Sequence, residues 1–169
     1  QTFVLSLDQG PQRLWSNLKS ECRTAIRKAR KNNVEIVEAT DKRFPDIYYE
    51  MAKDTYSKAN RRPPLSQEDY NTVWDLLRPF DRVKVLLARH ESQVIAGGIF
   101  LHFADKVYYW DGVALQRGYS LRPNNLLHWT LIEWGASNGL THYDMLGANI
   151  PSIARFKKSF GGELRTYTY

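Results

Sequence analysis

Three apolar segments follow one another closely in the middle of the chain, and they limit the fold more than any other feature. They span residues 83–88, 94–103 and 107–113, and short polar turns separate them. Their side chains are β-branched and aromatic, which favours strands, and short turns join neighbouring strands in an antiparallel manner. The sequence therefore predicts an antiparallel three-stranded meander at the centre of the protein.

The flanking segments add helices and further strands. Apolar spacing of three and four residues and the capping signals predict helices at residues 14–32, 44–59, 67–77, 125–137 and 151–160. Alternating apolar positions predict strands at residues 2–7, 34–37, 142–145 and 163–169. The helix at 125–137 is expected to act as a right-handed crossover, which makes the strand near Tyr143 parallel to the third meander strand. We predict an α+β fold, with a mixed, mostly antiparallel sheet flanked by helices.

Size and composition are those of one globular domain over residues 1–169, since the chain has 169 residues and 43% hydrophobic content. The single cysteine, Cys22, excludes an internal disulfide framework and suits a reducing, cytoplasmic location. No apolar run approaches the roughly 20 residues that cross a bilayer, so we expect no transmembrane segment. Because Gln1 is not an initiator, we expect a processed chain or a fragment of a longer protein.

The positive charge is concentrated near the N-terminus, although the whole chain carries a net charge of +6. Seven basic residues and one acidic residue lie between Arg13 and Lys31. Such a stripe favours a polyanionic partner, for example a phosphate-rich donor or RNA. A solvated helix face is an equally good interpretation of the pattern.

The segment that joins the meander to the helix at 125–137 has the composition of an anion site. It combines basic and amide side chains with a helix N-terminus, whose free N–H groups and dipole attract negative charge. The residues expected to hold the anion are Arg117, Gly118, Arg122, Asn124 and Asn125. A plain capped loop is the alternative.

The last third of the chain supplies further candidates. Lys157 lies between Phe156 and Phe160 on a short helix, and Gly161 with Gly162 follows it. Glycines allow positive φ and close approach of a ligand or a chain segment. Asp144 ends a buried strand, and Gly97 with Gly98 interrupts a meander strand, which predicts a bulge or a close approach there.

The chain resembles the Fem family, the peptidoglycan-bridge aminoacyltransferases, within the GNAT-type acyltransferase superfamily. The resemblance runs in order across most of the sequence. It rests on Arg23–Lys31 with Val34, Ile95-Ala96-Gly97-Gly98, Asn125–Trp129, Ile132–Ala136 with Gly139, Tyr143-Asp144 with Gly147, Phe156-Lys157, and Phe160-Gly161-Gly162. The long helical-hairpin arm of the family is missing, and residues 44–77 occupy that region.

The resemblance implies a GNAT-like fold and transfer of an activated acyl or aminoacyl group onto an amine, as in the modification of peptidoglycan or other cell-envelope precursors. Fem proteins have two GNAT-like domains, and this chain would be the second. The donor would be acyl-CoA or aminoacyl-tRNA, with tRNA as a partner in the second case. No tightly bound cofactor is implied, and the histidine and cysteine spacing predicts no metal site.

Acyl transfer requires a polarised carbonyl, a neutral amine and their alignment. We expect Lys157 to stabilise the oxyanion and Asp144 to act as general base. Gly97 and Gly98 would donate N–H groups to the donor if the strand bulges there. Tyr109, Phe156 and Gly161 are expected to contact substrate. Purely structural roles remain as alternatives: a surface ion pair for Lys157, a turn cap for Asp144 and relief of packing for the glycines.

Two other functions fit the same sequence. The basic segment and the pI near 9.4 also suit a non-catalytic RNA- or polyanion-binding module. The third alternative is a degenerate structural domain of a larger transferase.

Overall fold

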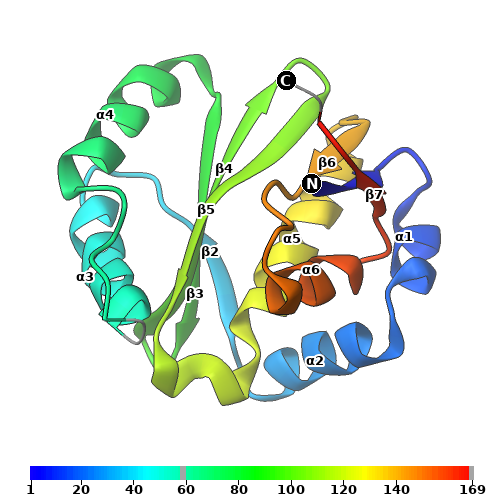
Figure 1. Ribbon diagram of the computed structural model, residues 1–169, viewed down its shortest axis with the longest axis horizontal. Coiled ribbons are helices and arrows are strands. Elements are labelled where there is room, and N and C mark those ends of the chain that lie inside the picture. The colour runs from blue at the N-terminus through cyan, green and yellow to red at the C-terminus, as the bar shows by residue number, and fades with distance from the viewer. Residues whose placement is uncertain (58–59, 168–169) are drawn as a thin grey trace.

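The computed structural model describes residues 1–57 and 60–167 of the protein. Its seven-stranded sheet has the order β2-β3-β4-β5-β6-β1-β7, and helices cover both faces (Figure 1). In the described part of the chain, every strand pair is antiparallel except β5 with β6. This arrangement confirms the predicted α+β class with a mixed, mostly antiparallel sheet.

The strands are β1 (Thr2–Ser6), β2 (Glu35–Glu38), β3 (Val83–His90), β4 (Gln93–Phe103), β5 (Lys106–Ala114), β6 (His142–Asp144) and β7 (Glu163–Arg165). The helices are α1 (Pro11–Asn17), α2 (Ser20–Lys31), α3 (Phe44–Ser57), α4 (Gln67–Leu77), α5 (Pro123–Ser137) and α6 (Pro151–Lys158). Two short 3₁₀ turns, η1 (Arg78–Phe80) and η2 (Gln116–Leu121), complete the fold.

The predicted meander is confirmed as β3, β4 and β5, which pair in sequence order. Helix α5 then carries the chain back, and β6 pairs in parallel with the first residues of β5. That ladder joins Lys106–Tyr108 to His142–Asp144 and stops there. The predicted parallel pair is therefore present, but it is short.

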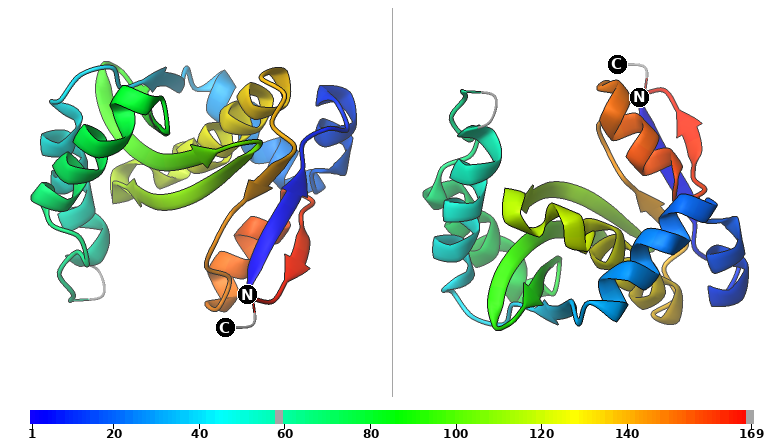
Figure 2. Two further views of the ribbon diagram at one scale, coloured as in Figure 1. Left: turned by 90° about the horizontal axis from the view of Figure 1, so that it is seen from above. Right: turned by 90° about the horizontal axis from the view of Figure 1, so that it is seen from below.

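Beyond this short ladder the sheet divides into two wings. We call β2–β5 the central wing and β6, β1 and β7 the terminal wing; seen from above, they diverge (Figure 2). One buried core contains Leu5 of the terminal wing with Ile26 of α2 and Leu131 of α5. A second core, on the other face of the central wing, contains Tyr48 of α3 and Tyr70 of α4. The first core also contains Leu86 and Phe100 of the central wing, so it spans both wings.

The N-terminus of α4 has the predicted cap. The Ser66 hydroxyl accepts a hydrogen bond from Asp69 N at 3.2 Å, and the Asp69 carboxylate accepts one from Ser66 N at 2.6 Å. This capping box satisfies two backbone donors that the helix leaves free.

The prediction of one helix over residues 14–32 is wrong, because the chain breaks at Leu18 and Lys19 into α1 and α2. Both residues are extended, and Lys19 N donates to Ser159 O at 2.9 Å. The guanidinium of Arg23 donates to the carbonyls of Ser16 and Leu18 at the end of α1. These tertiary and side-chain bonds replace the helical bonds, so apolar spacing alone did not reveal the break.

Two other predicted elements extend past the described residues. The helix predicted to residue 59 is described as far as Ser57, and residues 58–59 lie outside the described part. The last strand, predicted to residue 169, ends at Arg165, and residues 168–169 are likewise outside it.

Candidate active site

A cavity of about 770 Å³ lies where the two wings diverge. Its walls come from four places: the second half of β5, the η2–α5 junction, the loop after β6 and helix α6. Since the β5–β6 ladder ends at Tyr108, this edge of β5 has no strand partner from Tyr109 onward within the described residues. An unpaired strand edge offers backbone N–H and C=O groups to an extended ligand.

Lys157 projects from α6 into the wall of this cavity, and its side chain is buried, with 6% of the residue exposed. Its ammonium donates to the carbonyls of Met145 at 2.7 Å and Gly147 at 2.8 Å, and also to that of Leu146. Burial lowers the pKa of the Lys157 ammonium to about 8, while the charge of Asp144 opposes this shift. The loop after β6 is thus tied to α6 by a positive charge beside the cavity.

Asp144 is buried at the end of β6, but it is not among the residues that line the cavity. One carboxylate oxygen accepts from the Thr2 hydroxyl and, at 2.9 Å, from Leu146 N; the other accepts from the Tyr167 hydroxyl. Three donors therefore occupy this carboxylate. The contacts are those of a turn cap, the alternative role considered above, and they leave it poorly placed to accept a proton from a substrate.

Aromatic side chains form the apolar part of the site. Tyr109 and Phe156 line the cavity, and His128 lies behind them, with ring centroids 4.5 Å and 5.4 Å from theirs. The Lys157 ammonium lies 5.3 Å from the centre of the Tyr109 ring. Gly112 leaves room for the Tyr109 hydroxyl, because a Cβ atom there would overlap it. The Tyr109 side chain is therefore held between the His128 ring and the backbone of Gly112.

The N-terminus of α5 forms one end of the cavity, as the anion-site prediction requires. Pro123 is the first helical residue, and no side chain caps the helix. Arg122, Asn124 and Asn125 line the cavity. The exposed guanidinium of Arg122 and the positive end of the helix dipole both favour a negatively charged group here.

The other predicted site residues lie elsewhere. Arg117 is exposed on η2, and Gly118 is buried against Ile95, so neither lines the cavity. Gly161 has a φ of 84° and packs against the backbone of Asn17. It holds α6 against the end of α1 and is likewise absent from the lining.

Gly97 and Gly98 are also absent from the lining. Gly97 pairs with Leu87 and Val113, and Gly98 with Leu86 and Gly112, so the register is regular on both sides. The condition for free N–H donors, a bulge at these residues, is therefore not met. Side chains approach instead: a Cβ atom on Gly97 would lie 2.9 Å from the Tyr48 ring, which agrees with the predicted close approach and with relief of packing.

Several lining residues were not predicted from the sequence, above all Asp111 and Gly112 of β5. The signal for them was an acidic residue inside an otherwise apolar strand, followed by glycine. A bulge in β5 gives these residues their positions, and no feature of the sequence marks where that bulge falls.

Residues 16–158 match the family model for the acetyltransferase (GNAT) domain. Because the match extends over most of the chain, the protein belongs to this family of acyltransferase domains. The GNAT-type assignment made from the sequence is thereby confirmed. No curated protein sequence matches the chain.

Solved structures with the same fold include FemX, with a TM-score of 0.86 and 13% identity over 96% of this chain and 58% of FemX. The C-terminal domain of a putative lysylphosphatidylglycerol synthetase from Agrobacterium fabrum has a TM-score of 0.67 at 10% identity, covering 96% of this chain and 56% of that one. The aminoglycoside acetyltransferase AAC(6')-Iy, solved with a CoA bisubstrate analogue, has a TM-score of 0.63 at 12% identity, covering 81% and 97%. The chain thus spans little more than half of FemX.

Two further observations concern the described residues alone. None of their helices combines the length and apolar character needed to cross a membrane. No three histidine, cysteine or acidic side chains among them gather as ligands for a metal ion.

Proposed function

We propose that this protein transfers an activated acyl or aminoacyl group onto a primary amine of a peptidoglycan or other cell-envelope precursor. Membership of the GNAT family supports acyl transfer in general. The fold shared with FemX and with the lysylphosphatidylglycerol synthetase domain supports the cell-envelope acceptor. The observation that carries the proposal is the cavity where the free edge of β5, the Lys157 ammonium and the α5 N-terminus meet.

The reaction forms a C–N bond between the amine nitrogen and the donor carbonyl carbon. The bond that breaks joins this carbon to sulfur in an acyl thioester or to a ribose oxygen in an aminoacyl-tRNA. The amine loses a proton, and the leaving thiolate or alkoxide gains one. Negative charge develops on the carbonyl oxygen in the transition state, and a preorganised positive group lowers its energy.

Lys157 would act through its charge and not through a hydrogen bond, because its three N–H groups already donate to the carbonyls of Met145, Leu146 and Gly147. It remains largely charged at neutral pH, since its lowered pKa of about 8 is still above 7. The ammonium is buried, with the Tyr109 ring 5.3 Å away, and burial strengthens the electrostatic effect of a charge. The α5 N-terminus with Arg122 would hold a phosphate of the donor, and the edge of β5 would align the donor's extended arm.

The proposal has two forms, which differ in the donor: acyl-CoA or an aminoacyl-tRNA. Coenzyme A would place its pyrophosphate at the α5 N-terminus, and titration calorimetry with acyl-CoA would then register binding. An aminoacyl-tRNA would place its 3′ end in the cavity and its backbone phosphates outside. In that form calorimetry shows no heat with acyl-CoA, and a charged tRNA supports transfer.

The central experiment exploits two neighbouring lysines. Transfer from acyl-CoA or aminoacyl-tRNA to the ε-amine of a nucleotide-linked muropeptide is followed by mass spectrometry. We expect Lys157→Met to lower kcat/KM by about 100-fold, the size of effect seen when one oxyanion-stabilising group is removed. Lys158, the adjacent exposed residue, is the control, and Lys158→Met should keep the activity of the unchanged protein.

Other outcomes would refute the proposal. Steeply salt-dependent RNA binding by a folded protein that transfers no acyl group would identify a polyanion-binding module. Absence of both activities would identify a structural domain of a larger transferase. Circular dichroism of each variant separates loss of function from loss of fold.

We also propose that the chain is one of two GNAT-like units of a Fem-like protein, the second in order. Its coverage of 58% of FemX supports this organisation. A longer protein from the same gene, containing a second sheet of the same kind, would bear it out.

A further inference from the structure

The outer strand of the terminal wing, β7, has a free edge. It is last in the sheet order and pairs with β1, and in the part of the chain that the structure describes no strand pairs with its other side. The strand runs along the outside of the molecule (Figure 2). All of its residues are exposed, and 54% of Leu164 is accessible to solvent. An open strand edge can pair with a further strand, so this edge is a candidate docking surface.

The register of β1 shows which backbone groups of β7 point outward. Facing residues of an antiparallel pair alternate between hydrogen-bonded and non-hydrogen-bonded positions. Phe3 O accepts a hydrogen bond from Met145 N at 2.9 Å, so the backbone polar groups of Phe3 face the β6 side. Phe3 is also the residue opposite Leu164 in the β1–β7 ladder. The N–H and C=O groups of Leu164 therefore point away from β1, toward the open edge.

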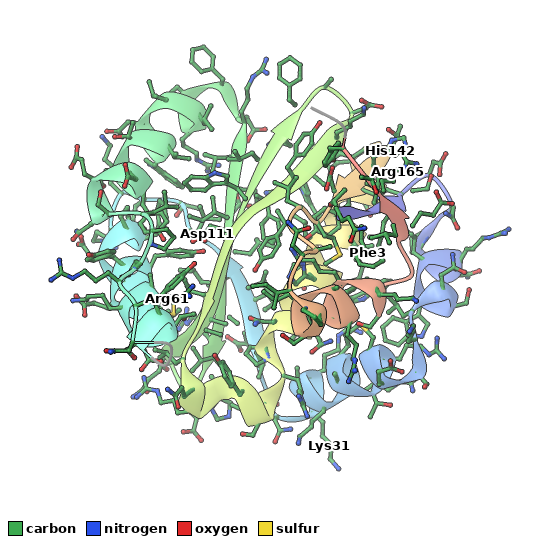
Figure 3. All side chains as sticks on the ribbon, in the orientation of Figure 1. Phe3, Lys31, Arg61, Asp111, His142 and Arg165 are labelled. Carbon is green, nitrogen blue, oxygen red and sulfur yellow. The ribbon has the colours of Figure 1, made fainter. Side chains whose placement is uncertain are left out.

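The side chains of β7 divide into a charged face and an apolar face. Glu163 and Arg165 are two residues apart and share one face of the strand, whereas Leu164 lies on the other. The Arg165 guanidinium is 3.7 Å from the Glu163 carboxylate, and 52% and 81% of the two side chains are exposed. An ion pair this exposed contributes little to stability. Both charges are thus available to a second strand, and Figure 3 labels Arg165 on the outer side of the terminal wing.

We propose that two copies of this chain associate by antiparallel pairing of their β7 strands, which joins the two sheets into one. Leu164 then lies opposite Leu164 of the second copy, and each N–H donates to the other copy's C=O. Glu163 of each copy faces Arg165 of the other at a non-hydrogen-bonded position, where facing side chains are closest. The two-fold symmetry forms this ion pair twice. None of these residues lines the cavity, so the inference is independent of the proposed acyl transfer.

The charge pattern of β7 selects one register for this pairing. If the symmetry centre moved to Glu163, that carboxylate would face its own copy, and a centre at Arg165 would bring two guanidinium groups together. Like charges directly opposite each other destabilise a strand pair. Among the symmetric registers centred within β7, the one centred on Leu164 places opposite charges face to face. This self-complementarity favours a second copy over an unrelated peptide as the occupant of the edge.

The first test is the oligomeric state of the complete protein. A three-residue strand buries less surface than the roughly 1,200 Å² of a stable interface, so we expect a weak dimer. Sedimentation velocity over about 1–500 μM protein should show a reversible shift from monomer to dimer as concentration rises. A chain that stays monomeric throughout this range overturns the proposal, even if an added extended peptide binds the edge.

Charge reversal tests the register. In Glu163→Arg both facing pairs become Arg with Arg, and in Arg165→Glu both become Glu with Glu. We expect each variant alone to raise the dissociation constant of the dimer at least tenfold. An equimolar mixture of the two should dimerise like the unchanged protein, because every facing pair is again Arg with Glu. Failure of the mixture to form this heterodimer would exclude the register centred on Leu164.

Glu91→Arg is the control for net charge, because it makes the same change on the exposed β3–β4 turn. We expect it to dimerise like the unchanged protein. A loss as large as that of Glu163→Arg would show that overall charge, and not the facing pair, governs association.

Leu164→Pro tests the backbone pairing separately. Proline removes an N–H that points away from β1, so the β1–β7 ladder keeps its own bonds, and proline is tolerated at such edge positions. We expect this variant to keep the circular dichroism of the unchanged protein and to lose the dimer. Leu164→Ala retains the N–H and should dimerise more strongly than Leu164→Pro. Equal dimerisation by the two folded variants would show that another surface joins the copies.

Discussion

His128 lies behind the cavity within a cluster of aromatic rings, and 1% of it is exposed. Its Nδ1 atom is 2.6 Å from the Tyr143 hydroxyl, and the Phe160 ring centre is 5.3 Å away. Burial, together with the nearby Lys157 charge, lowers the pKa of the imidazole to about 3. The ring is therefore neutral in the folded protein over the whole physiological range.

This environment predicts how stability depends on pH. The unfolded chain binds a proton at His128 below the ordinary pKa of 6.5, whereas the folded protein does so only near pH 3. The free energy of unfolding should consequently fall as pH decreases from about 6.5 to 3, by at most about 5 kcal/mol from this group. Urea unfolding of His128→Phe should show a smaller decrease over that range. His90→Asn, at the β3–β4 turn, should follow the unchanged protein, and parallel curves for His128→Phe would refute the explanation.

At the residue scale, the sequence indicated which side chains could act at a site, but not which residues donate hydrogen bonds to them. Lys157, Tyr109, Phe156 and the start of α5, all named from the sequence, line one cavity. It favoured Asp144, because an acidic residue at a strand end is a common catalytic position. The hydrogen bonds from Thr2 and Tyr167 come from residues 142 and 23 positions away, and local sequence carries no record of them.

At the scale of elements, Gly161 lies where the turn after α6 contacts the end of α1. Its φ of 84° is left-handed, and a Cβ atom would lie 2.6 Å from the carbonyl oxygen of Asn17. The contact joins the turn after α6 to the end of α1, next to the bond from Lys19 to Ser159 that separates α1 from α2. The break between α1 and α2, which the sequence did not predict, is thus maintained by Ser159, about 140 positions further along the chain.

Replacing this glycine should destabilise the fold more than backbone strain alone does. A left-handed residue with a side chain costs about 1–2 kcal/mol, and the overlap with Asn17 adds to it. We expect Gly161→Ala to lower the free energy of unfolding by about 3 kcal/mol or more in urea titrations. Gly139→Ala is the matched control, because its φ is 74° and no atom lies within 4 Å of the added methyl group. Equal losses in both variants would show that the Asn17 contact has no energetic role.

The elements themselves were largely predictable, since the meander and the crossover helix have strong patterns. Their boundaries and interruptions were not, because tertiary hydrogen bonds set them. The bulge in β5 is the clearest case: residues 107–113 read as one continuous strand, yet the extra residue Trp110 decides which side of the sheet Asp111 faces. Side-chain packing against α3 and α4 fixes this choice.

At the scale of the whole molecule, charge is unevenly distributed. Exposed basic residues follow α2, among them Lys28 and Lys31, and Lys31 points away from the protein body (Figure 3). Helix α2 packs near η2 and α5, on the side of the molecule where the cavity ends. A polyanionic donor would meet this basic face as it enters.

For an aminoacyl-tRNA donor we expect transfer to weaken as salt rises from 50 to 200 mM, because salt screens phosphate contacts. The double variant Lys28→Glu, Lys31→Glu should lower kcat/KM for this donor by about tenfold and leave that for acyl-CoA unchanged. The same reversal at Lys42 and Lys53, on the α3 side, is the control for net charge. Identical effects of the two double variants would show that α2 does not guide the donor.

The short parallel ladder between β5 and β6 also has a mechanical consequence. In the described part of the chain, three residue pairs join the two wings across the sheet, whereas β3 and β4 share eight. Local opening motions are expected where the fewest hydrogen bonds oppose them. We therefore expect the two wings to move relative to each other at the β5–β6 ladder. A substrate that contacts both wings would oppose this motion, and its binding would raise the free energy of unfolding of the whole protein.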